Sequence, residues 1–453
     1  MSDTLTVESI VARIERLPVA PWHVRMRAII ASATFFDAFD ALTIAFVMPA
    51  LLGPWHLNPA QIGVMISGGY IGQVIGSLGF GWLAERFGRL RVLSWTVILI
   101  AVMSLACAFA WDFQSLFYLR VIQGLGLGGE VPIAATYINE FAKTKQRGFF
   151  LLIYQNIFPV AIIFISVVSI WVVPHWGWQS MFVIGTVPAI IAAWMRRSLP
   201  ESPRWLAVHG RLAEADAALK GIEDEISEGG SRPLPPPATN IPRIVEANAR
   251  VRELLEGIYL GRTIVLWIMW FAAAFVGYGI TIWMPTIYRT VFHLDVQTAL
   301  TYSLYNNITP LLGGLTCAWL VDKVGRRFVF TMGFGCAAIP LLVLWGMGGA
   351  ITLTAAMITA IIVSFFAPML QLGLVLYGGE IYPTRMRALG TGMGSAWTRI
   401  GTIVGPPIVG ALLQSAGLAT VFLMFAIVSL IGAVAMAFFA VETRGRLLEE
   451  LSP

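Results

Sequence analysis

Long apolar runs recur along almost the whole chain, and they limit what it can fold into. We count twelve, each about as long as the ~20 residues that a helix needs to cross ~30 Å of hydrocarbon. Because lipid cannot satisfy free backbone N–H and C=O groups, each run should be a helix. Their expected bounds are Ala28–Leu52, Gln61–Ala84, Val92–Trp111, Leu116–Tyr137, Phe149–Val173, Trp178–Met195, Thr263–Tyr288, Thr298–Val321, Phe328–Met347, Leu353–Gly379, Gly390–Leu413 and Val421–Val441. The sequence therefore predicts an all-α, polytopic membrane protein with twelve transmembrane helices.

The basic residues agree with this topology. With both termini cytoplasmic, 27 of the 30 Lys and Arg fall in cytoplasmic segments, which is the positive-inside bias of membrane proteins. The bias accounts for the pI of 9.2, so no nucleic acid partner is needed. Only 12% of the residues are charged, against about 25% in soluble domains. We expect a monomer that spans the bacterial inner (plasma) membrane many times, with the lipid bilayer as its surroundings.

An internal repeat divides the predicted spans into two sets of six. The segment Gly81–Arg89 is similar to Ala318–Arg327, at an offset of 237 residues. Glu140 corresponds to Glu380, at an offset of 240 residues. Two halves related by an axis along the membrane normal would produce such a repeat. We expect an N-terminal cytoplasmic tail (1–27), a six-helix bundle (28–196), a cytoplasmic loop with short helices (197–262), a second six-helix bundle (263–441) and a cytoplasmic tail (442–453).

Short motifs spread over the chain resemble those of one transporter family. The acidic-basic-x-Gly-Arg element at Glu85–Arg89 resembles the major facilitator signature, although Glu85 stands where Asp is usual and Leu90 where a basic residue is common. Pro200–Leu206 and Glu442–Arg446 resemble the signatures of its sugar-porter-like branch. The resemblance implies the major facilitator fold, with two pseudo-symmetric six-helix bundles, and solute transport by alternating access.

Acidic and basic residues at matched span ends predict a latch that holds the two halves together on the cytoplasmic side. Positive-inside anchoring alone would explain the arginines but not the acids. The predicted latch residues are Glu85, Arg86, Arg89, Glu140, Arg147, Asp322, Arg326, Arg327, Glu380 and Arg387. Breaking their contacts would accompany opening toward the cytoplasm.

Five charged residues remain inside the predicted spans: Asp37, Asp40, Arg120, Glu130 and Arg399. A charge at a helix centre costs at least ~2.5–3.5 kcal/mol on insertion scales, so we expect these side chains to be paired and functional. Asp37 and Asp40 are three residues apart and share one face of the first span, an arrangement that suits reversible protonation.

The segment that begins at Arg120 resembles a family motif, Arg-x-x-x-Gly, in the fourth span. In proton-coupled relatives that Arg pairs with an Asp of the first span, and by this resemblance Asp40 is the partner. We predict that Asp40 carries the proton, holds Arg120 when it is ionised and releases it when protonated, with help from Asp37 or Glu130. A permanent structural pair in a uniporter is the main alternative, and sodium coupling is another.

The eleventh predicted span contains Arg399 and no acidic residue. A guanidinium that faces a midplane cavity offers a two-pronged site for a carboxylate. The stretch Trp397–Pro406 resembles the corresponding segment of organic anion transporters, where that Arg helps to bind anions. We therefore predict an organic anion as the solute, with a structural pair between Arg399 and Glu130 as the alternative.

Aromatic and amide side chains within the spans are predicted to line the solute path beside Arg399. They are Tyr154, Gln155, Asn156, Tyr278, Trp283, Tyr305, Asn306, Asn307, Gln371, Tyr377 and Trp397. Each one alone is more often a packing residue. Gln155 matches a sugar-contacting Gln of sugar porters, but Ala273 and Ala274 stand where those relatives carry two glutamines, which disfavours sugar.

Two segments, Phe36–Asp40 and Gly126–Pro132, resemble bacterial nicotinate transporters and aromatic-acid:proton symporters, and the synaptic vesicle glycoprotein 2 group shares much of the pattern. The resemblance implies a small aromatic monocarboxylate such as nicotinate as the substrate. Symport of a sugar or polyol, transport of an organic cation or drug, and a non-transporting sensor are the alternatives. Because the spans hold no cluster of His and Cys, we expect no metal site, no cofactor and no enzyme activity.

Overall fold

The computed structural model describes residues 5–141, 157–227, 233–237 and 251–444. Its internal contacts divide the chain into two compact units. The first comprises Met1–Ala41, Ile71–Ala161 and Gln179–Val245, and the second comprises Leu42–Tyr70, Ile162–Trp178 and Glu246–Pro453. Three helices contribute residues to both units: α2 (Pro21–Leu51), α3 (Pro59–Phe87) and α7 (Ile157–Trp176).

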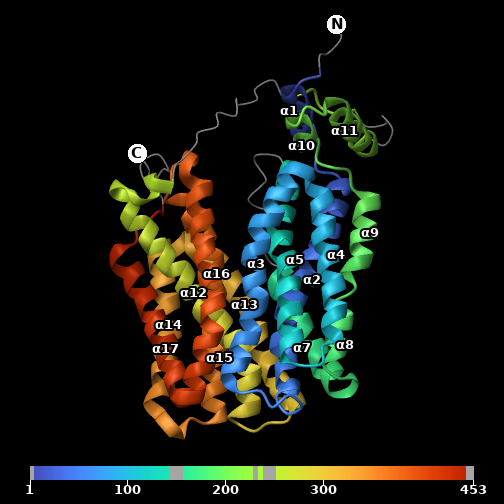
Figure 1. The fold of residues 1–453 in the computed structure, drawn as a ribbon. Helices are drawn as coiled ribbons and strands as arrows, with labels where there is room; N and C mark the ends of the chain where they lie inside the picture. Colours follow the sequence, from blue (N-terminus) through green and yellow to red (C-terminus); the bar gives the residue numbers. More distant parts are fainter. Residues whose placement is uncertain (1–4, 142–156, 228–232, 238–250, 445–453) are drawn as a thin grey trace. The chain divides into compact units, whose positions relative to one another are not determined.

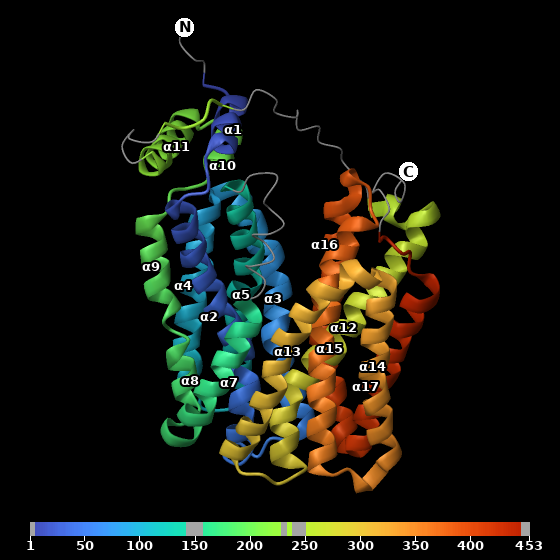
Figure 2. The ribbon, with the colours of Figure 1, turned by 180° about the vertical axis from the view of Figure 1, so that it is seen from behind.

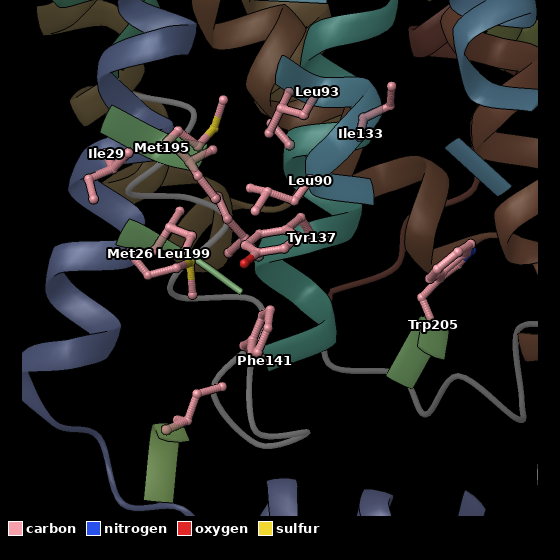
Figure 3. Packing of buried hydrophobic residues seen from close by; sticks show 14 of the residues in the cluster. Met26, Ile29, Leu90, Leu93, Ile133, Tyr137, Phe141, Met195, Leu199 and Trp205 are labelled. Atoms are coloured by element: carbon pink, nitrogen blue, oxygen red, sulfur yellow. The ribbon is translucent and has the colours of Figure 1, made fainter. Parts of the chain in front are cut away.

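The first unit is a bundle of helices with an apolar interior. Besides parts of α2, α3 and α7 it contains α4 (Arg89–Ala108), α5 (Phe113–Phe141), α8 (Gln179–Ile184) and α9 (Pro188–Ser198). The helices α2, α4, α5 and α9 run alongside one another in both views (Figure 1, Figure 2). Figure 3 shows where their faces meet: Tyr137 and Phe141 of α5 lie with Leu90 of α4 and Met195 of α9, all of them buried.

Three short helices complete the first unit: α1 (Val7–Arg16), α10 (Pro203–Val208) and α11 (Leu212–Ile226). Ion pairs hold α1 on α11, with Arg13 Nη2 at 2.6 Å from Glu223 Oε2 and Arg16 Nη2 at 2.7 Å from Glu223 Oε1. Burial alone would raise the pKa of Glu223, but hydrogen bonds from the two guanidinium groups bring it below its ordinary value. The carboxylate is therefore held in its ionised form at the centre of this contact.

The second unit contains the helices of the C-terminal half. They are α12 (Gly257–Thr290), α13 (Val296–Val324), α14 (Arg326–Met347), α15 (Leu353–Glu380), α16 (Thr384–Ser415) and α17 (Gly417–Val434), with the short turns η1 (Val251–Leu255), η2 (Gly348–Ala350) and η3 (Ala435–Phe439) at helix ends. The last of these is a π-helix that continues α17. Within this unit α13 packs on α15, α14 on α17, and α12 on α16.

The predicted all-α membrane fold is confirmed, since the described residues form helices and contain no strand. Nine helices in the described part of the chain are long and apolar enough to cross a bilayer. Two more, α5 and α13, have 29 residues each, or about 44 Å of helix, and carry the buried polar groups that lower their hydropathy. With the pair α8 and α9 they occupy the remaining predicted spans.

The predicted sixth span, Trp178–Met195, is broken rather than continuous. The helix α8 ends at Ile184 and α9 begins at Pro188. Between them the N–H of Thr186 bonds the carbonyl oxygen of Val183 at 3.0 Å, a contact one residue shorter than in an α-helix. Proline lacks a backbone N–H, but at the first turn of α9 this costs no hydrogen bond, because the first N–H groups of a helix have no acceptor within it.

Glycines let pairs of helices approach closely in both units. A side chain at Gly76 of α3 would overlap the backbone of Leu125 in α5, and one at Gly313 of α13 would overlap the backbone of Phe365 in α15. Gly313 follows Gly76 by 237 residues and Phe365 follows Leu125 by 240, the same offsets as in the sequence repeat. In lipid no hydrophobic driving force brings helices together, and close packing at small residues stabilises their association instead. The sequence repeat is therefore also a repeat of helix contacts.

Candidate functional site

A buried polar network joins α2, α4 and α5 in the first unit. The side chains of Asp40 and Arg120 have almost no exposed surface. Arg120 donates from Nη1 to the backbone carbonyl oxygen of Asp40 at 2.9 Å and from Nη2 to that of Ala41 at 3.1 Å. It also donates from Nη1 to Oε1 of Gln123, one turn further along α5, at 2.6 Å. The guanidinium therefore grips the backbone of α2 at the predicted proton site.

The carboxylate of Asp40 receives its hydrogen bonds on one oxygen. Ser104 Oγ on α4 donates to Oδ1 at 2.7 Å, and Gln123 Nε2 donates to the same atom at 3.3 Å. No group among the described residues donates to Oδ2, which is also buried. Gln123 thus bridges Arg120 and the carboxylate, because its oxygen accepts from one and its nitrogen donates to the other.

A second buried carboxylate lies on the same helix pair. Glu130 of α5 is fully buried, and its Oε1 accepts a hydrogen bond from Thr34 Oγ1 of α2 at 2.8 Å. Its other oxygen has no donor within the part of the chain that the structure describes. Thr34 precedes Asp40 by six residues, so the levels of these two residues differ by about 9 Å along α2. Asp37, also buried, stands between these levels.

No group of His, Cys, Asp or Glu in the described ranges could hold a metal ion. The buried network of α2, α4 and α5 can instead hold or release a proton, because it combines carboxylates with neutral hydrogen-bond partners.

The predicted latch residues of the first unit form a compact ion network. Arg89 Nη2 is 2.8 Å from Glu85 Oε1, and Arg89 Nε is 3.1 Å from Glu140 Oε1. The carboxylate of Glu201 accepts from the backbone N–H of Leu90 at 2.9 Å, at the start of α4. The preceding Gly88 has φ = 108°, a conformation that side-chain-bearing residues avoid, and it brings the chain close to Glu201.

The second unit repeats this network. Arg326 bonds Asp322 at 2.9 Å and Glu380 at 2.8 Å, and Glu442 accepts from the backbone N–H groups of Arg326 and Arg327 at 3.0 Å each. Gly325 has φ = 107°, matching Gly88. Arg89 and Arg326 of the predicted latch therefore pair with acids of their own unit.

The other predicted latch residues have different surroundings. Arg86 lies over the ring of Trp82, 5.6 Å from its centroid, and the carbonyl of Arg387 accepts from Thr391 Oγ1. The sequence did not single out Glu201 and Glu442 as site residues, yet both cap a helix. Their separation of 241 residues, close to the repeat offset, is the signal that would have found them.

Several predicted lining residues of the second unit have structural contacts. Tyr377 is fully buried, and its hydroxyl accepts from the N–H of Val441 at 3.0 Å, so we assign it to packing. Trp283 is fully buried as well. Asn306 donates to Tyr288 Oη at 3.4 Å.

The remaining candidates differ in exposure and partners. Asn307 of α13 is buried and donates to Ser166 Oγ of α7 at 2.9 Å. Tyr305 is 48% exposed. Arg147, Tyr154, Gln155 and Asn156 lie outside the described residues.

Arg399 is partly buried on α16, two residues after Trp397. The ring of Trp397 lies 5.4 Å from that of Trp267 on α12, and the two line an apolar hollow of about 290 Å³. Gln371 of α15 faces α12 at Gly277, where a Cβ would be 3.7 Å from its Nε2. The ring of Tyr278, the next residue on α12, is 6.4 Å from that of Tyr70.

Known proteins resemble this chain over most of its length. The sequence model of the family "Sugar (and other) transporter" matches residues 34–453. The niacin transporter NiaP of Acinetobacter baylyi is 33% identical over 449 residues, 98% of this chain and 99% of that protein. The gallate transporter of Pseudomonas putida is 28% identical over 405 residues, 88% of each chain. Among solved structures, the xylose transporter XylE of Escherichia coli in a partially occluded inward-open conformation has a TM-score of 0.74 at 18% identity, and covers 94% of this chain and all of that one, a likeness of fold alone.

The helical fold with charged groups buried between its helices is that of a multi-pass membrane transporter. The chain belongs to the sugar (and other) transporter family of the major facilitator superfamily, as its motifs predicted. Members of this superfamily move small solutes and are not enzymes.

Proposed function

We propose that this chain is a symporter that couples proton movement to the transport of a small organic anion, an aromatic monocarboxylate such as nicotinate, by alternating access. The observation that carries the proposal is the fully buried carboxylate of Asp40 in a network with Arg120. Niacin and gallate, which the named relatives transport, are both small aromatic carboxylic acids.

Asp40 is suited to exchange a proton because its surroundings support both of its states. An ionised carboxylate inside a membrane protein needs donors, and Ser104 and Gln123 supply two on Oδ1. When the carboxylate is protonated on Oδ1, its O–H can donate to Ser104 Oγ, which lies 2.7 Å away. The proposed role of Arg120 is to fix α2 at this site and to favour the ionised state through Gln123.

The proposed ligand for the substrate carboxylate is Arg399, because a guanidinium can donate two parallel hydrogen bonds to a carboxylate. Trp397, on the same helix, offers an aromatic face for a flat ring. Gln371 is the amide proposed to bond a ring nitrogen or hydroxyl. Asp37 and Glu130 are proposed to assist proton movement between Asp40 and the far end of α2.

We further propose that both termini face the cytoplasm, since the basic loop residues then obey the positive-inside bias. The networks around Arg89 and Arg326 would lie on that side. We propose the latch in a modified form. The networks around Arg89 and Arg326 each stiffen the helix ends of their own unit, and opening toward the cytoplasm changes the contacts that these helix ends make. The transporter is proposed to act as a monomer.

The direct test is uptake of labelled nicotinate into proteoliposomes that contain the purified protein. Accumulation should require an inward proton gradient, and a sodium gradient alone should not support it. Excess xylose or an organic cation should not compete. Binding of nicotinate without any flux would contradict the proposal and favour a sensor, and uptake indifferent to the proton gradient would favour a uniporter.

Asp40→Asn tests the proton site. The variant should lose accumulation driven by the proton gradient but keep exchange of internal for external nicotinate, because exchange needs no net release of a proton. Asp112→Asn is the matched control, since Asp112 is exposed and accepts from the N–H of Ser115 at a helix start. Unchanged dependence on the proton gradient in Asp40→Asn would exclude Asp40 as the proton carrier.

A further inference from the structure

The hydroxyl of Ser104 lies between two acceptors but has one hydrogen to donate. Its Oγ is 2.7 Å from Asp40 Oδ1 and 3.0 Å from the backbone carbonyl oxygen of Phe182 in α8. All three residues are fully buried in the first unit. A single hydroxyl hydrogen can serve only one acceptor well at a time. Which of the two oxygens accepts the Ser104 hydrogen therefore depends on whether the carboxylate of Asp40 is ionised or protonated.

The carbonyl of Phe182 stands at the break in the sixth span. The N–H of Thr186, which would bond this oxygen in a continuous α-helix, bonds Val183 instead, and the chain passes through Gly185 before α9 begins. A side chain at Gly185 would overlap both Ser104 Oγ and Asp40 Oδ1. The break is thus in direct contact with the carboxylate and with the hydroxyl that bonds it.

We propose that Ser104 is a positioning residue that transmits the protonation state of Asp40 to the broken α8–α9 segment. The inference rests on the proposed function, because it takes Asp40 as the proton carrier. While Asp40 is ionised, the hydroxyl donates to Oδ1. When Asp40 takes up a proton from solvent on Oδ1, that O–H donates to Ser104 Oγ, and the serine hydrogen turns to the carbonyl of Phe182. One proton is gained and no covalent bond of the protein is broken.

Ser104 is the neighbour of the Asp40 carboxylate that we propose changes its hydrogen-bond acceptor. Among the described residues, the charged or titratable groups around Asp40 are Arg120 of α5, Cys107 of α4 and Asp37 of α2 itself. Arg120 carries a fixed charge and is bonded to backbone carbonyls of α2 and to Gln123. On α8, the carbonyl of Phe182 contacts Ser104 Oγ, and on the turn after it a Cβ at Gly185 would overlap both Ser104 Oγ and Asp40 Oδ1.

Two variants and a matched control test the proposal. Ser104→Ala removes the hydroxyl, and Ser104→Thr restores it in a slightly larger side chain. Ser94→Ala is the control: Ser94 is a buried serine of the same helix whose hydroxyl donates to the carbonyl of Leu90, one turn earlier. Should Ser104→Ala fail to fold, Ser104→Cys decides the question, because a thiol has similar volume and is a weak donor.

The first readout is the pH at which nicotinate uptake is half-maximal. Ser104→Ala should move it upward by about one pH unit, since the ionised carboxylate loses a donor whose bond is stronger than the one made by the protonated form. Ser104→Thr and Ser94→Ala should match the wild type.

The second readout is hydrogen–deuterium exchange of the peptide 182–190, corrected for the intrinsic effect of pH. In the wild type its protection should change across the pH range in which uptake changes. In Ser104→Ala it should stay constant, as it should in Asp40→Asn. A merely structural role for the serine would lower protection equally at every pH.

The outcomes separate this inference from the proposed function. If Ser104→Ala keeps both the uptake midpoint and the pH-dependent protection of the wild type while Asp40→Asn loses proton coupling, the role of Ser104 is refuted and the function stands. If Asp40→Asn keeps its dependence on the proton gradient, the proposed function fails, and this inference fails with it.

Discussion

Removing the charge of Glu442 should destabilise the second unit by an amount that can be worked out from its contacts. The carboxylate accepts from three backbone N–H groups: those of Arg326 and Arg327 at 3.0 Å, where α14 begins, and that of Arg444 at 2.9 Å. In Glu442→Gln one oxygen becomes an NH₂ group that cannot accept. Loss of one charge-assisted bond costs ~1.5–3 kcal/mol and loss of the helix-dipole interaction ~0.3–1 kcal/mol. Because the group is partly exposed to solvent, we expect the lower part of this range, about 2 kcal/mol.

The assay is thermal unfolding of the purified protein in detergent, followed by tryptophan fluorescence. A loss of about 2 kcal/mol should lower Tm by about 4–8 °C for a unit of this size. The control is Glu256→Gln, whose carboxylate is 55% exposed and pairs with Arg252 within one helical turn. Such exposed pairs contribute ~0–1 kcal/mol, so its Tm should hardly change.

Acid should remove the difference between Glu442→Gln and the wild type. Burial tends to raise the pKa of Glu442, but the backbone N–H donors bring it below its ordinary value. A group with a lowered folded pKa stabilises the fold above its unfolded pKa and loses that effect as pH falls through the folded pKa. The gap in Tm should therefore be full at pH 7 and shrink below about pH 4. A Glu442→Gln variant that melts like Glu256→Gln, or a gap unchanged in acid, would refute the reasoning.

Three further variants have expected outcomes. Arg399→Ala should weaken nicotinate binding at least tenfold in a thermal-shift titration, while Arg289→Ala, outside the proposed site, should bind as the wild type does; equal affinity in both would remove Arg399 from the site. Gly76→Val should abolish accumulation of folded protein in the membrane because the side chain would overlap the backbone of α5, whereas Gly79→Val, which has open space around it, should express normally. Glu223→Gln should release α1 from α11 and speed proteolysis of the N-terminal segment. In the wild type this release should begin only below about pH 4, because the pKa of Glu223 is lowered. Release of α1 in the wild type already at pH 6 would contradict this prediction.

The sequence predicted the class of fold because its signal is strong and local. Apolar runs of span length and a repeated charge motif need no knowledge of tertiary contacts, and the helices and the family agree with them. The break in the sixth span was missed because the run Trp178–Met195 is mostly apolar and contains no charged residue. Only Gly185 and Pro188 within it marked the interruption.

The candidate site was predictable only in its charged members. Asp40 and Arg120 stand out because a charge within an apolar span is costly. Ser104 and Gln123 complete the network, but neutral polar residues are common in membrane helices and carry no such signal. Tyr377 was predicted to line the solute path, and the structure gives its hydroxyl a partner at Val441, a contact that no pattern in the sequence indicates.

The central claim is that Asp40 takes a proton across with the solute, and proton movement itself is the measurement that tests it. Proteoliposomes with a pH-sensitive dye inside receive nicotinate outside, at equal initial pH on both sides. The account predicts internal acidification that starts with nicotinate in the wild type and is absent in Asp40→Asn, although that variant still exchanges nicotinate. Acidification of the same size in Asp40→Asn would contradict it.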